Sequence, residues 1–140
     1  MTYLLDTCVI SELVAKRPDP KVTRWIDSVD PESVSLSVVT IGEIRKGIEK
    51  IRESARKESL ERWLHEDLLI RFRDHLSVLD AKVLLGWGAL TGRLEIQGTP
   101  MPAMDSLIAA TALSHDLVLA TRNERDFLNA GIKLFNPWTG

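Results

Sequence analysis

The sequence predicts an α/β fold, in which helices cover a sheet of mostly parallel strands. Short runs rich in Val, Leu and Ile alternate with longer stretches of helical periodicity, which is the pattern of repeated strand and helix units. Turn residues bound these runs locally, but no Pro-rich or Gly-rich linker and no repeat divides the chain. For a chain of 140 residues we expect a single domain over residues 1–140.

The individual strands and helices follow from the spacing of apolar residues. The candidate strands are Thr2–Leu5, Val34–Ser37, Ser77–Leu79, Leu117–Ala120 and Ile132–Phe135. Between them, apolar residues recur three or four positions apart, which predicts helices. These helical patterns are Ile41, Ile44, Ile48 and Ile51; Leu60, Trp63, Leu64, Leu68 and Phe72; Val83, Trp87, Leu90 and Leu94; and Met104, Leu107, Ile108 and Thr111.

Composition and charge exclude several classes of protein. Hydrophobic residues make up 44% of the chain and charged residues 27%, which is typical of a globular domain rather than a disordered or fibrous protein. The lone Cys8 excludes an intrachain disulfide, and no long apolar run indicates a membrane protein, so we expect a cytoplasmic location. The net charge of −2 does not indicate nucleic-acid binding, and we interpret the basic excess between residues 45 and 73 as a solvated helix face.

Acidic residues gather where the predicted strands end. In open parallel sheets the functional crevice lies beyond the carboxyl ends of the strands. Asp6 follows the first strand directly, and Glu43 lies in the first turn of the helix after the second strand. Asn123 and Asp126 follow the strand that ends at Ala120. We therefore expect the sheet to bring these side chains to one edge.

Helix capping is an alternative explanation for several of these residues. Asp6 or Thr7 fits the N-cap of a helix. The Thr40–Glu43 stretch fits a capping box, in which the Glu side chain reaches back to the first amide, and Thr121–Glu124 fits the same pattern. Taken one at a time, these acids are explained by caps.

Asp105 fits a cap less well because its neighbours are nearly all apolar. It shares a helix face with Ala109 and Ala112, small residues that let a helix approach a sheet closely. A carboxylate held there is costly unless a positive charge meets it, and a helix N-terminus supplies only part of that charge. Oxygen ligands without His or Cys suit Mg²⁺ or Mn²⁺. A cation held by Asp6, Glu43 and Asp105 is therefore predicted.

A set of short motifs also runs through nearly the whole chain in a fixed order. The motifs are Leu4–Thr7, Val9–Glu12, Leu36–Thr40, Gly42–Ile44 with Gly47, Asp105–Ala112, Leu119–Asn123 with Asp126 and Phe127, and Phe135–Trp138. Taken together, this ordered set resembles the PIN-domain ribonucleases of the VapC toxin type, and particularly the FitB-like branch. Each motif alone is a weak signal, whereas their order along the chain is specific.

The resemblance implies a three-layer α/β/α sandwich with a central, mostly parallel sheet. It also implies a Mg²⁺-dependent or Mn²⁺-dependent endoribonuclease toxin that cleaves RNA by metal-activated water, with Asp6 and Asp105 as the principal metal ligands and Glu43 orienting the nucleophile. Some FitB-like members carry an acid where this chain has Asn123, so either Asn123 or Asp126 completes the site. The implied protein partners are a VapB-type antitoxin and a second copy of the chain in a homodimer.

Other polar and aromatic residues near these motifs also have structural interpretations. Thr7, Ser11 and Arg122 are candidates for contacts with RNA phosphates or, for the hydroxyls, with the ligating carboxylates. Cys8 is interpreted as a small buried hydrophobe, because no motif pairs it with a His. We interpret the three histidines as exposed or structural, namely His65, His75 and His115. We interpret three tryptophans as core or interface residues, namely Trp25, Trp63 and Trp87.

Two other functions are compatible with acids at strand ends. One is a phosphohydrolase with Asp6 as the nucleophile, although Cys8 stands where a second Asp would be expected. The other is a non-catalytic receiver-like or RNA-binding module, in which the acids are caps and a regulatory cation site. Trapping of a phospho-aspartyl intermediate would support the first, and RNA retention without cleavage would support the second.

Overall fold

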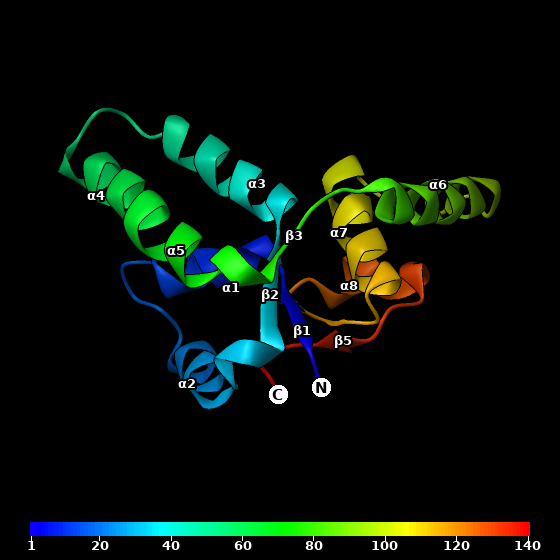
Figure 1. Ribbon diagram of the computed structural model, residues 1–140, viewed down its shortest axis with the longest axis horizontal. Helices are drawn as coiled ribbons and strands as arrows, with labels where there is room; N and C mark the ends of the chain where they lie inside the picture. Colours follow the sequence, from blue (N-terminus) through cyan, green and yellow to red (C-terminus); the bar gives the residue numbers. More distant parts are fainter.

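The computed structural model describes residues 1–140 and is built around a five-stranded sheet (Figure 1). The strands are β1 (Tyr3–Leu5), β2 (Val34–Ser37), β3 (Leu76–Ser77), β4 (Val118–Ala120) and β5 (Leu134–Phe135), in the spatial order β3-β2-β1-β4-β5. Every pair of neighbouring strands is parallel, so the predicted parallel sheet is confirmed.

The two edge strands differ from the predicted boundaries. The prediction of a strand over Ser77–Leu79 is wrong by one residue at its start and two at its end, because β3 pairs only with Leu36 and Ser37, the last two residues of β2. Beyond that point β2 gives way to a helix, so the residues that follow β3 have no strand to pair with. At the other edge, β5 begins at Leu134 rather than at Ile132.

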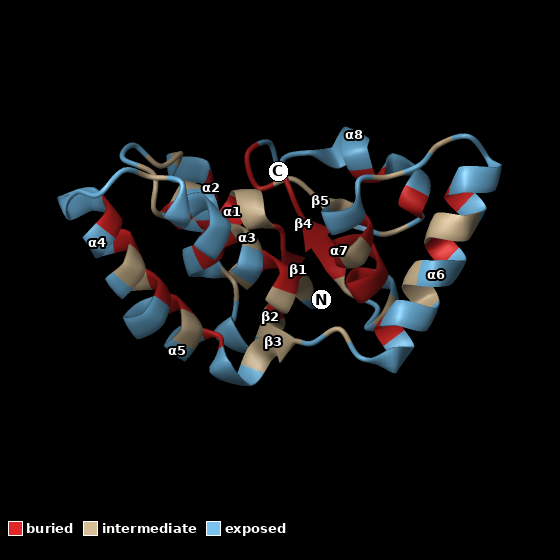
Figure 2. Cartoon of the chain, turned by 90° about the horizontal axis from the view of Figure 1, so that it is seen from above, coloured by how far each residue is buried: buried red, intermediate tan, exposed pale blue.

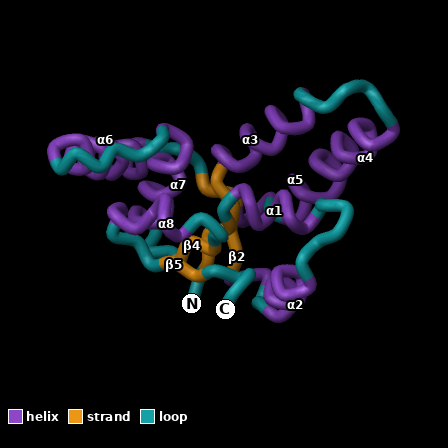
Figure 3. The backbone as a smooth tube through the Cα atoms, turned by 180° about the vertical axis from the view of Figure 1, so that it is seen from behind, coloured by secondary structure: helices purple, strands orange, loops and turns teal.

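Helices cover both faces of the sheet and give the expected three-layer α/β/α sandwich. On one side lie α1 (Thr7–Leu13), α2 (Pro20–Ser28), α3 (Val38–Glu49), α4 (Ala55–Trp63) and α5 (Leu69–Arg71), and on the other lie α6 (Ala81–Ile96), α7 (Ala103–Ser114) and α8 (Glu124–Phe127) (Figures 1 and 3). A π-helical stretch over Leu64–Leu68 joins α4 to α5, and short 3₁₀ turns occupy Pro31–Ser33, Arg73–His75 and Leu128–Ala130. No helix combines the length and the apolar character needed to cross a bilayer.

Strand β1 separates two hydrophobic cores. Leu5 packs with residues of α1, α2, α3 and α4, whereas Leu4 packs with residues of α6, α7 and β4. Side chains alternate along a strand, so these adjacent leucines face opposite layers, and both are fully buried. Figure 2 shows the buried central strands between helices whose outer surfaces are exposed. Burial on both faces explains why the first strand is a continuous apolar run.

Helix α3 begins earlier than the sequence predicts. The Ser37 hydroxyl oxygen accepts a hydrogen bond from the Val39 amide (3.0 Å) and caps the helix, which begins at Val38. The predicted capping box over Thr40–Glu43 is therefore wrong, because this stretch already lies inside the helix. Glu43 lies in the second turn rather than the first, and its side chain takes no part in capping.

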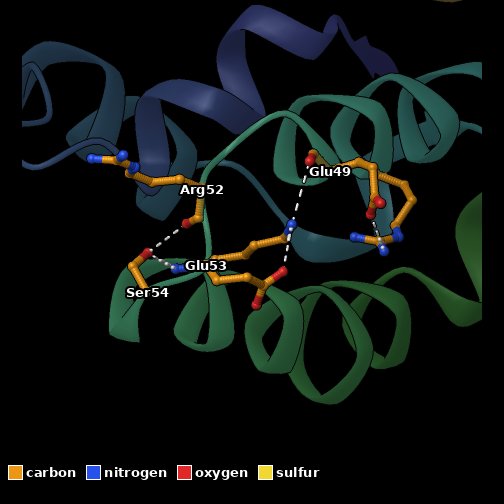
Figure 4. Close-up of polar contacts among 6 residues, drawn as sticks. Glu49, Arg52, Glu53 and Ser54 are labelled. Atoms are coloured by element: carbon orange, nitrogen blue, oxygen red, sulfur yellow. Dashed lines mark hydrogen bonds and ion pairs between the residues drawn. The ribbon is translucent and has the colours of Figure 1, made fainter.

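A buried lysine joins the end of α3 to the start of α4. The Lys57 ammonium donates to the Glu49 carbonyl oxygen (3.3 Å) and pairs with the Glu53 carboxylate (3.1 Å) in the connecting loop (Figure 4). The Lys57 side chain is 8% exposed, whereas that of Glu53 is 85% exposed. Carbonyl groups at the end of a helix carry a partial negative charge, so the buried contact is expected to contribute more than the exposed ion pair.

We expect Lys57→Met, which keeps the apolar stem, to lower the free energy of unfolding by about 1–2 kcal/mol. Glu53→Gln is expected to lower it by less than about 0.5 kcal/mol, because the carboxylate is exposed and screened. Urea denaturation of the two variants measures the difference. Equal losses would show that the ion pair, and not the contact with the helix end, joins α3 to α4.

Candidate active site

Asp6 lies where the central strand ends. Its backbone amide donates to the Ala120 carbonyl oxygen (2.9 Å), so the chain leaves β1 beside the end of β4. Its Oδ1 accepts the Thr7 amide (2.8 Å), and its Oδ2 accepts the Thr121 hydroxyl (2.8 Å). The residue is 5% exposed. Asp6 therefore caps α1, as the capping alternative predicts, and is also held by a residue from the end of a second strand.

Glu43 is linked to the same region through Thr7. The Thr7 hydroxyl donates to Glu43 Oε1 (2.7 Å) and lies 3.1 Å from the Thr40 hydroxyl oxygen. Thr7 is the first residue of α1 and Glu43 lies on α3, so this bond connects the helices that follow the neighbouring strands β1 and β2. Of the two roles predicted for Thr7, the structure shows the contact with a site carboxylate.

Asp105 lies in the first turn of α7, within electrostatic reach of three other acids. Burial, followed by the negative charges of Asp6, Asp126 and Glu43, raises the pKa of Asp105 to about 6. Charges influence one another this strongly only at short range. The fold therefore brings together acids from four separate segments, at the end of β1 and on α3, α7 and α8.

No basic side chain neutralises these four acids. Burial raises the pKa of Asp6, and the hydrogen bonds from Thr121, Thr7 and Cys8 offset this only in part. The ion pairs of the protein join other residues, namely Arg45 with Glu49, Lys57 with Glu53, His75 with Glu32 and Lys133 with Asp116. Buried carboxylates without a positive partner are costly at neutral pH. A bound cation would remove this cost.

The side chains present fit a divalent cation by their chemistry. All four are carboxylates, and oxygen ligands are those that Mg²⁺ and Mn²⁺ prefer. No three His, Cys, Asp or Glu side chains form a closed cluster of ligands in the structure. The match to a cation therefore rests on the donor type and on the unpaired charge of the acids, above all Asp6 and Asp105.

A cleft of about 660 Å³ opens beside this site, between α3 and α7. Of the four acids, only Glu43 lines it. Lys46 and Lys50 also line it from α3, and Met104 and Leu107 line it from α7. The cleft thus has the Glu43 carboxylate at one position and two lysines, one in the last turn of α3 and one directly after it, at another, which suits an extended anionic ligand.

The structure places both candidates for the fourth site position near the other acids. Asp126 raises the pKa of Asp105, so it lies within electrostatic reach of the site. Asn123 is exposed at the N-cap of α8, and its side chain makes no capping hydrogen bond. Ser11 is exposed and lines a second cleft together with Glu43. Asp126 is equally exposed, and the Asn123 backbone amide donates to Thr121 Oγ1 (3.0 Å), so both residues stay candidates for the fourth position.

Cys8 lies between the site and the larger hydrophobic core. Its side chain is half-buried, and its Sγ lies 3.7 Å from both Asp6 Oδ2 and Thr121 Oγ1. Cys8 also packs against the larger hydrophobic core, so the prediction of a small hydrophobe without a reactive role agrees with the structure, although two polar groups contact the thiol as well. Burial and the negative charge of Asp6 raise the pKa of the Cys8 thiol, which keeps it protonated and unreactive.

The histidines and the predicted core tryptophans have structural surroundings, as expected. Two of the three histidines are exposed, and the third, His75, lies 3.3 Å from Glu32. Trp25 and Trp63 pack against the larger hydrophobic core, and the Trp87 indole donates to a serine hydroxyl of α7 (2.8 Å). All three indole rings are partly buried, which agrees with the predicted core or interface role.

Thr121 is a site residue that the sequence explains only as a cap. It is fully buried, donates to Asp6 Oδ2 (2.8 Å) and accepts the Asn123 amide (3.0 Å). Leu5 and Ala120 are paired in the β1–β4 register, so the residues that follow them, Asp6 and Thr121, are neighbours. The sequence does show a Thr directly after an apolar strand. That this Thr contacts Asp6, however, depends on the register of β1 with β4, which the sequence alone does not specify.

If the acids hold a divalent cation, Thr121→Val is expected to weaken Mg²⁺ binding, measured by titration calorimetry, by about 10- to 100-fold, the usual cost of losing a partner that orients a metal ligand. Val has nearly the same shape but cannot donate to Asp6. Thr111→Val is the matched control, because Thr111 is equally buried but donates to the Leu107 carbonyl oxygen of its own helix (2.8 Å). An equal loss of Mg²⁺ affinity in the two variants would contradict this role of Thr121.

Comparison with known proteins agrees with this geometry. The model of the PIN domain family matches residues 3–133. Toxin FitB of Neisseria gonorrhoeae is 35% identical over 135 residues, which cover 96% of this chain and 97% of that protein. VapC ribonuclease Y4jK of Sinorhizobium fredii is 32% identical over 135 residues, which cover 96% of each.

Solved structures show the same relationship. The crystal structure of FitAcB from Neisseria gonorrhoeae contains a chain with a TM-score of 0.92 and 34% identity, covering 98% of this chain and 99% of that one. VapBC-1 from nontypeable Haemophilus influenzae gives a TM-score of 0.78 at 26% identity over 100% of both chains. The match in sequence and fold spans every segment that contributes an acid to the site. The chain belongs to the PIN domain family.

Proposed function

We propose that this chain is a metal-dependent endoribonuclease and the toxin of a toxin–antitoxin module. The observation that carries the proposal is the meeting of carboxylates without a basic partner, in which Thr121 holds Asp6, Thr7 holds Glu43, and no ion pair neutralises either acid. The raised pKa of Asp105, caused by burial and by the other acids, supports it. Relatives named VapC ribonuclease support RNA as the substrate. We also infer a cytoplasmic location, where such an RNA substrate would be met.

Asp6 and Asp105 are the proposed metal ligands, and Glu43 and Asp126 complete the acidic site. Mg²⁺ is the expected cation, with Mn²⁺ as an alternative that prefers the same ligands. When bound, the cation supplies an acidified water and the positive charge that offsets charge developing on the phosphate. Thr121 holds Asp6 and Thr7 holds Glu43, so both carboxylates are oriented before substrate arrives.

The proposed protein partner is a VapB-type antitoxin. The structural relatives include FitAB bound to a DNA fragment and a toxin–antitoxin complex from Klebsiella pneumoniae. For this chain we infer inhibition by a basic antitoxin side chain that enters the acidic site, because a guanidinium or ammonium group would neutralise the four carboxylates in place of the cation. We also infer that the chain pairs as a homodimer.

Cleavage of a structured RNA by the purified chain tests the proposal. We expect cleavage with Mg²⁺ or Mn²⁺, none with EDTA, and none for Asp6→Asn with either metal. Asp74→Asn is the matched control. It removes an equal charge from an exposed position in the 3₁₀ turn before β3, which contributes no residue to the site. Cleavage that survives both EDTA and Asp6→Asn would overturn the mechanism. RNA retention without cleavage under every metal condition would favour a binding module instead.

A further inference from the structure

The C-terminal Asn136–Trp138 segment is held against α1 and α8 by a set of hydrogen bonds. The Trp138 indole N–H donates to Glu12 Oε1 of α1 (3.1 Å), and the Trp138 backbone amide donates to Asn136 Oδ1 (2.8 Å). Asn136 Nδ2 donates in turn to Glu124 Oε1 of α8 (3.0 Å). Trp138 is only 8% exposed. Its ring is therefore fixed by both burial and hydrogen bonds.

Arg122 lies over this fixed ring. Its guanidinium carbon is 5.3 Å from the centroid of the Trp138 ring, which is within the range of a cation–π contact. The residue is exposed, and no carboxylate forms an ion pair with it. Glu124, the acid two residues away, is already bonded to Asn136. The Arg122 guanidinium therefore keeps both its charge and its N–H donors available to a ligand.

The backbone on either side of Arg122 is fixed to the acidic site. Thr121, the residue before it, donates to Asp6 Oδ2, and Asn123, the residue after it, donates its amide to Thr121 Oγ1 (3.0 Å). Arg122, whose charge is unpaired, thus directly follows Thr121, the residue whose hydroxyl orients the proposed metal ligand Asp6. Neither helix capping nor metal binding by this segment explains why the Arg122 guanidinium is stacked on the Trp138 ring.

We propose that Arg122 binds an RNA phosphate next to the cleaved one, and that Trp138 is the positioning residue that holds Arg122 there. This inference rests on the proposed ribonuclease function. Four carboxylates repel the RNA backbone, and a positive charge on the segment that holds Asp6 counteracts that repulsion along the bound strand. Stacking on Trp138 orients the planar guanidinium without neutralising it, whereas a salt bridge would consume its charge.

Binding of the cleaved RNA, measured in an Asp105→Asn background to prevent cleavage, tests the role of Arg122. We expect Arg122→Ala to raise the Kd about tenfold, as for the loss of one charge-assisted hydrogen bond. The slope of log Kd against log salt should fall by about 0.7, the value for one phosphate contact on a single strand. Arg125→Ala removes an equal charge from an exposed position of α8 and should change the Kd by less than about twofold.

The role of Trp138 is tested through its coupling to Arg122. Trp138→Leu should raise the Kd as much as Arg122→Ala, and the double variant should bind no more weakly than Arg122→Ala alone. Trp138→Phe keeps a ring for stacking but loses the indole N–H, so it should retain most of the affinity even if it melts at a lower temperature. In cleavage-competent protein, we expect Arg122→Ala to raise KM more than it lowers kcat.

Two results would overturn the inference. One is an equal loss of affinity in Arg122→Ala and Arg125→Ala, and the other is an additive loss in the Arg122 and Trp138 double variant. Both would leave the ribonuclease proposal standing, because that proposal depends on Asp6 and Asp105. Conversely, a wild-type chain that binds RNA through Arg122 but never cleaves it would overturn the proposed function and support the phosphate contact.

Discussion

Asp105→Asn is expected to abolish RNA cleavage while raising the melting temperature of the metal-free protein. Cleavage should fall at least about 100-fold, because several kcal/mol of charge stabilisation depend on the cation that Asp105 is proposed to hold. Stability should rise because the substitution removes one of four unpaired acids that repel each other in the absence of metal.

The stability effect has a defined pH dependence. The pKa of Asp105 rises from 3.8 to about 6 on folding, so the protonated side chain is favoured in the folded protein. Protonation of Asp105 therefore stabilises the folded protein. This contribution to the free energy of unfolding is fully present below the unfolded-state pKa of 3.8 and is lost as the pH rises through the folded-state pKa of about 6. Above that pH, Asp105→Asn should be more stable than wild type by about 1–2 kcal/mol, after allowance for partial exposure. The difference should vanish toward pH 4.

Thermal unfolding in EDTA between pH 4 and pH 8 measures this difference. Addition of Mg²⁺ should raise the melting temperature of the wild type more than that of Asp105→Asn, because a ligand stabilises only the state that binds it. Asp74→Asn again serves as the control and should follow the wild type at every pH. A melting temperature for Asp105→Asn that equals the wild type at pH 8 in EDTA would contradict the electrostatic description of the site.

Phe127→Ala is expected to cause the largest loss of stability, about 3–5 kcal/mol. Phe127 is 1% exposed and packs with core residues of α6, α7 and β4. It is also the only buried residue of the four-residue helix α8, which carries Asp126. The substitution therefore leaves a cavity in the core and removes the anchor of a site residue.

Urea denaturation of Phe127→Ala checks the expected loss, with Leu128→Ala as the matched control. Leu128 is the next residue and is 65% exposed, so its truncation should change the free energy of unfolding by less than about 0.5 kcal/mol. A loss below about 1 kcal/mol for Phe127→Ala would show that the core around α8 does not depend on this ring. The smaller change Phe127→Leu keeps the protein folded for activity measurements and should still weaken cleavage.

Much of the fold could be predicted from the sequence because local patterns decide it. Apolar runs as short as Tyr3–Leu5 mark strands that are buried on both faces, and regular apolar spacing marks the helices between them. The errors lie at boundaries. The start of α3 was misplaced because Ser37, not Thr40, supplies the cap, and the extent of β3 depends on where β2 ends. Such boundaries depend on partners that are distant in sequence.

The sequence by itself determined the chemistry of the candidate site. Asp6, Glu43, Asp105 and Asp126 are all placed at strand ends or early in helices, and their motifs lead to the correct family. The choice between Asp126 and Asn123 stays open, and the sequence did not reveal the polar contacts of the Cys8 thiol.

Only the tertiary structure decided which side chains meet. The β1–β4 register pairs Asp6 with Thr121, the packing of α1 beside α3 pairs Thr7 with Glu43, and the C-terminal segment pairs Arg122 with Trp138. Side-chain type is a local property of the chain, whereas the burial and mutual repulsion that raise the pKa of Asp105 arise from segments up to about a hundred residues apart. These interactions exist only once the chain has folded.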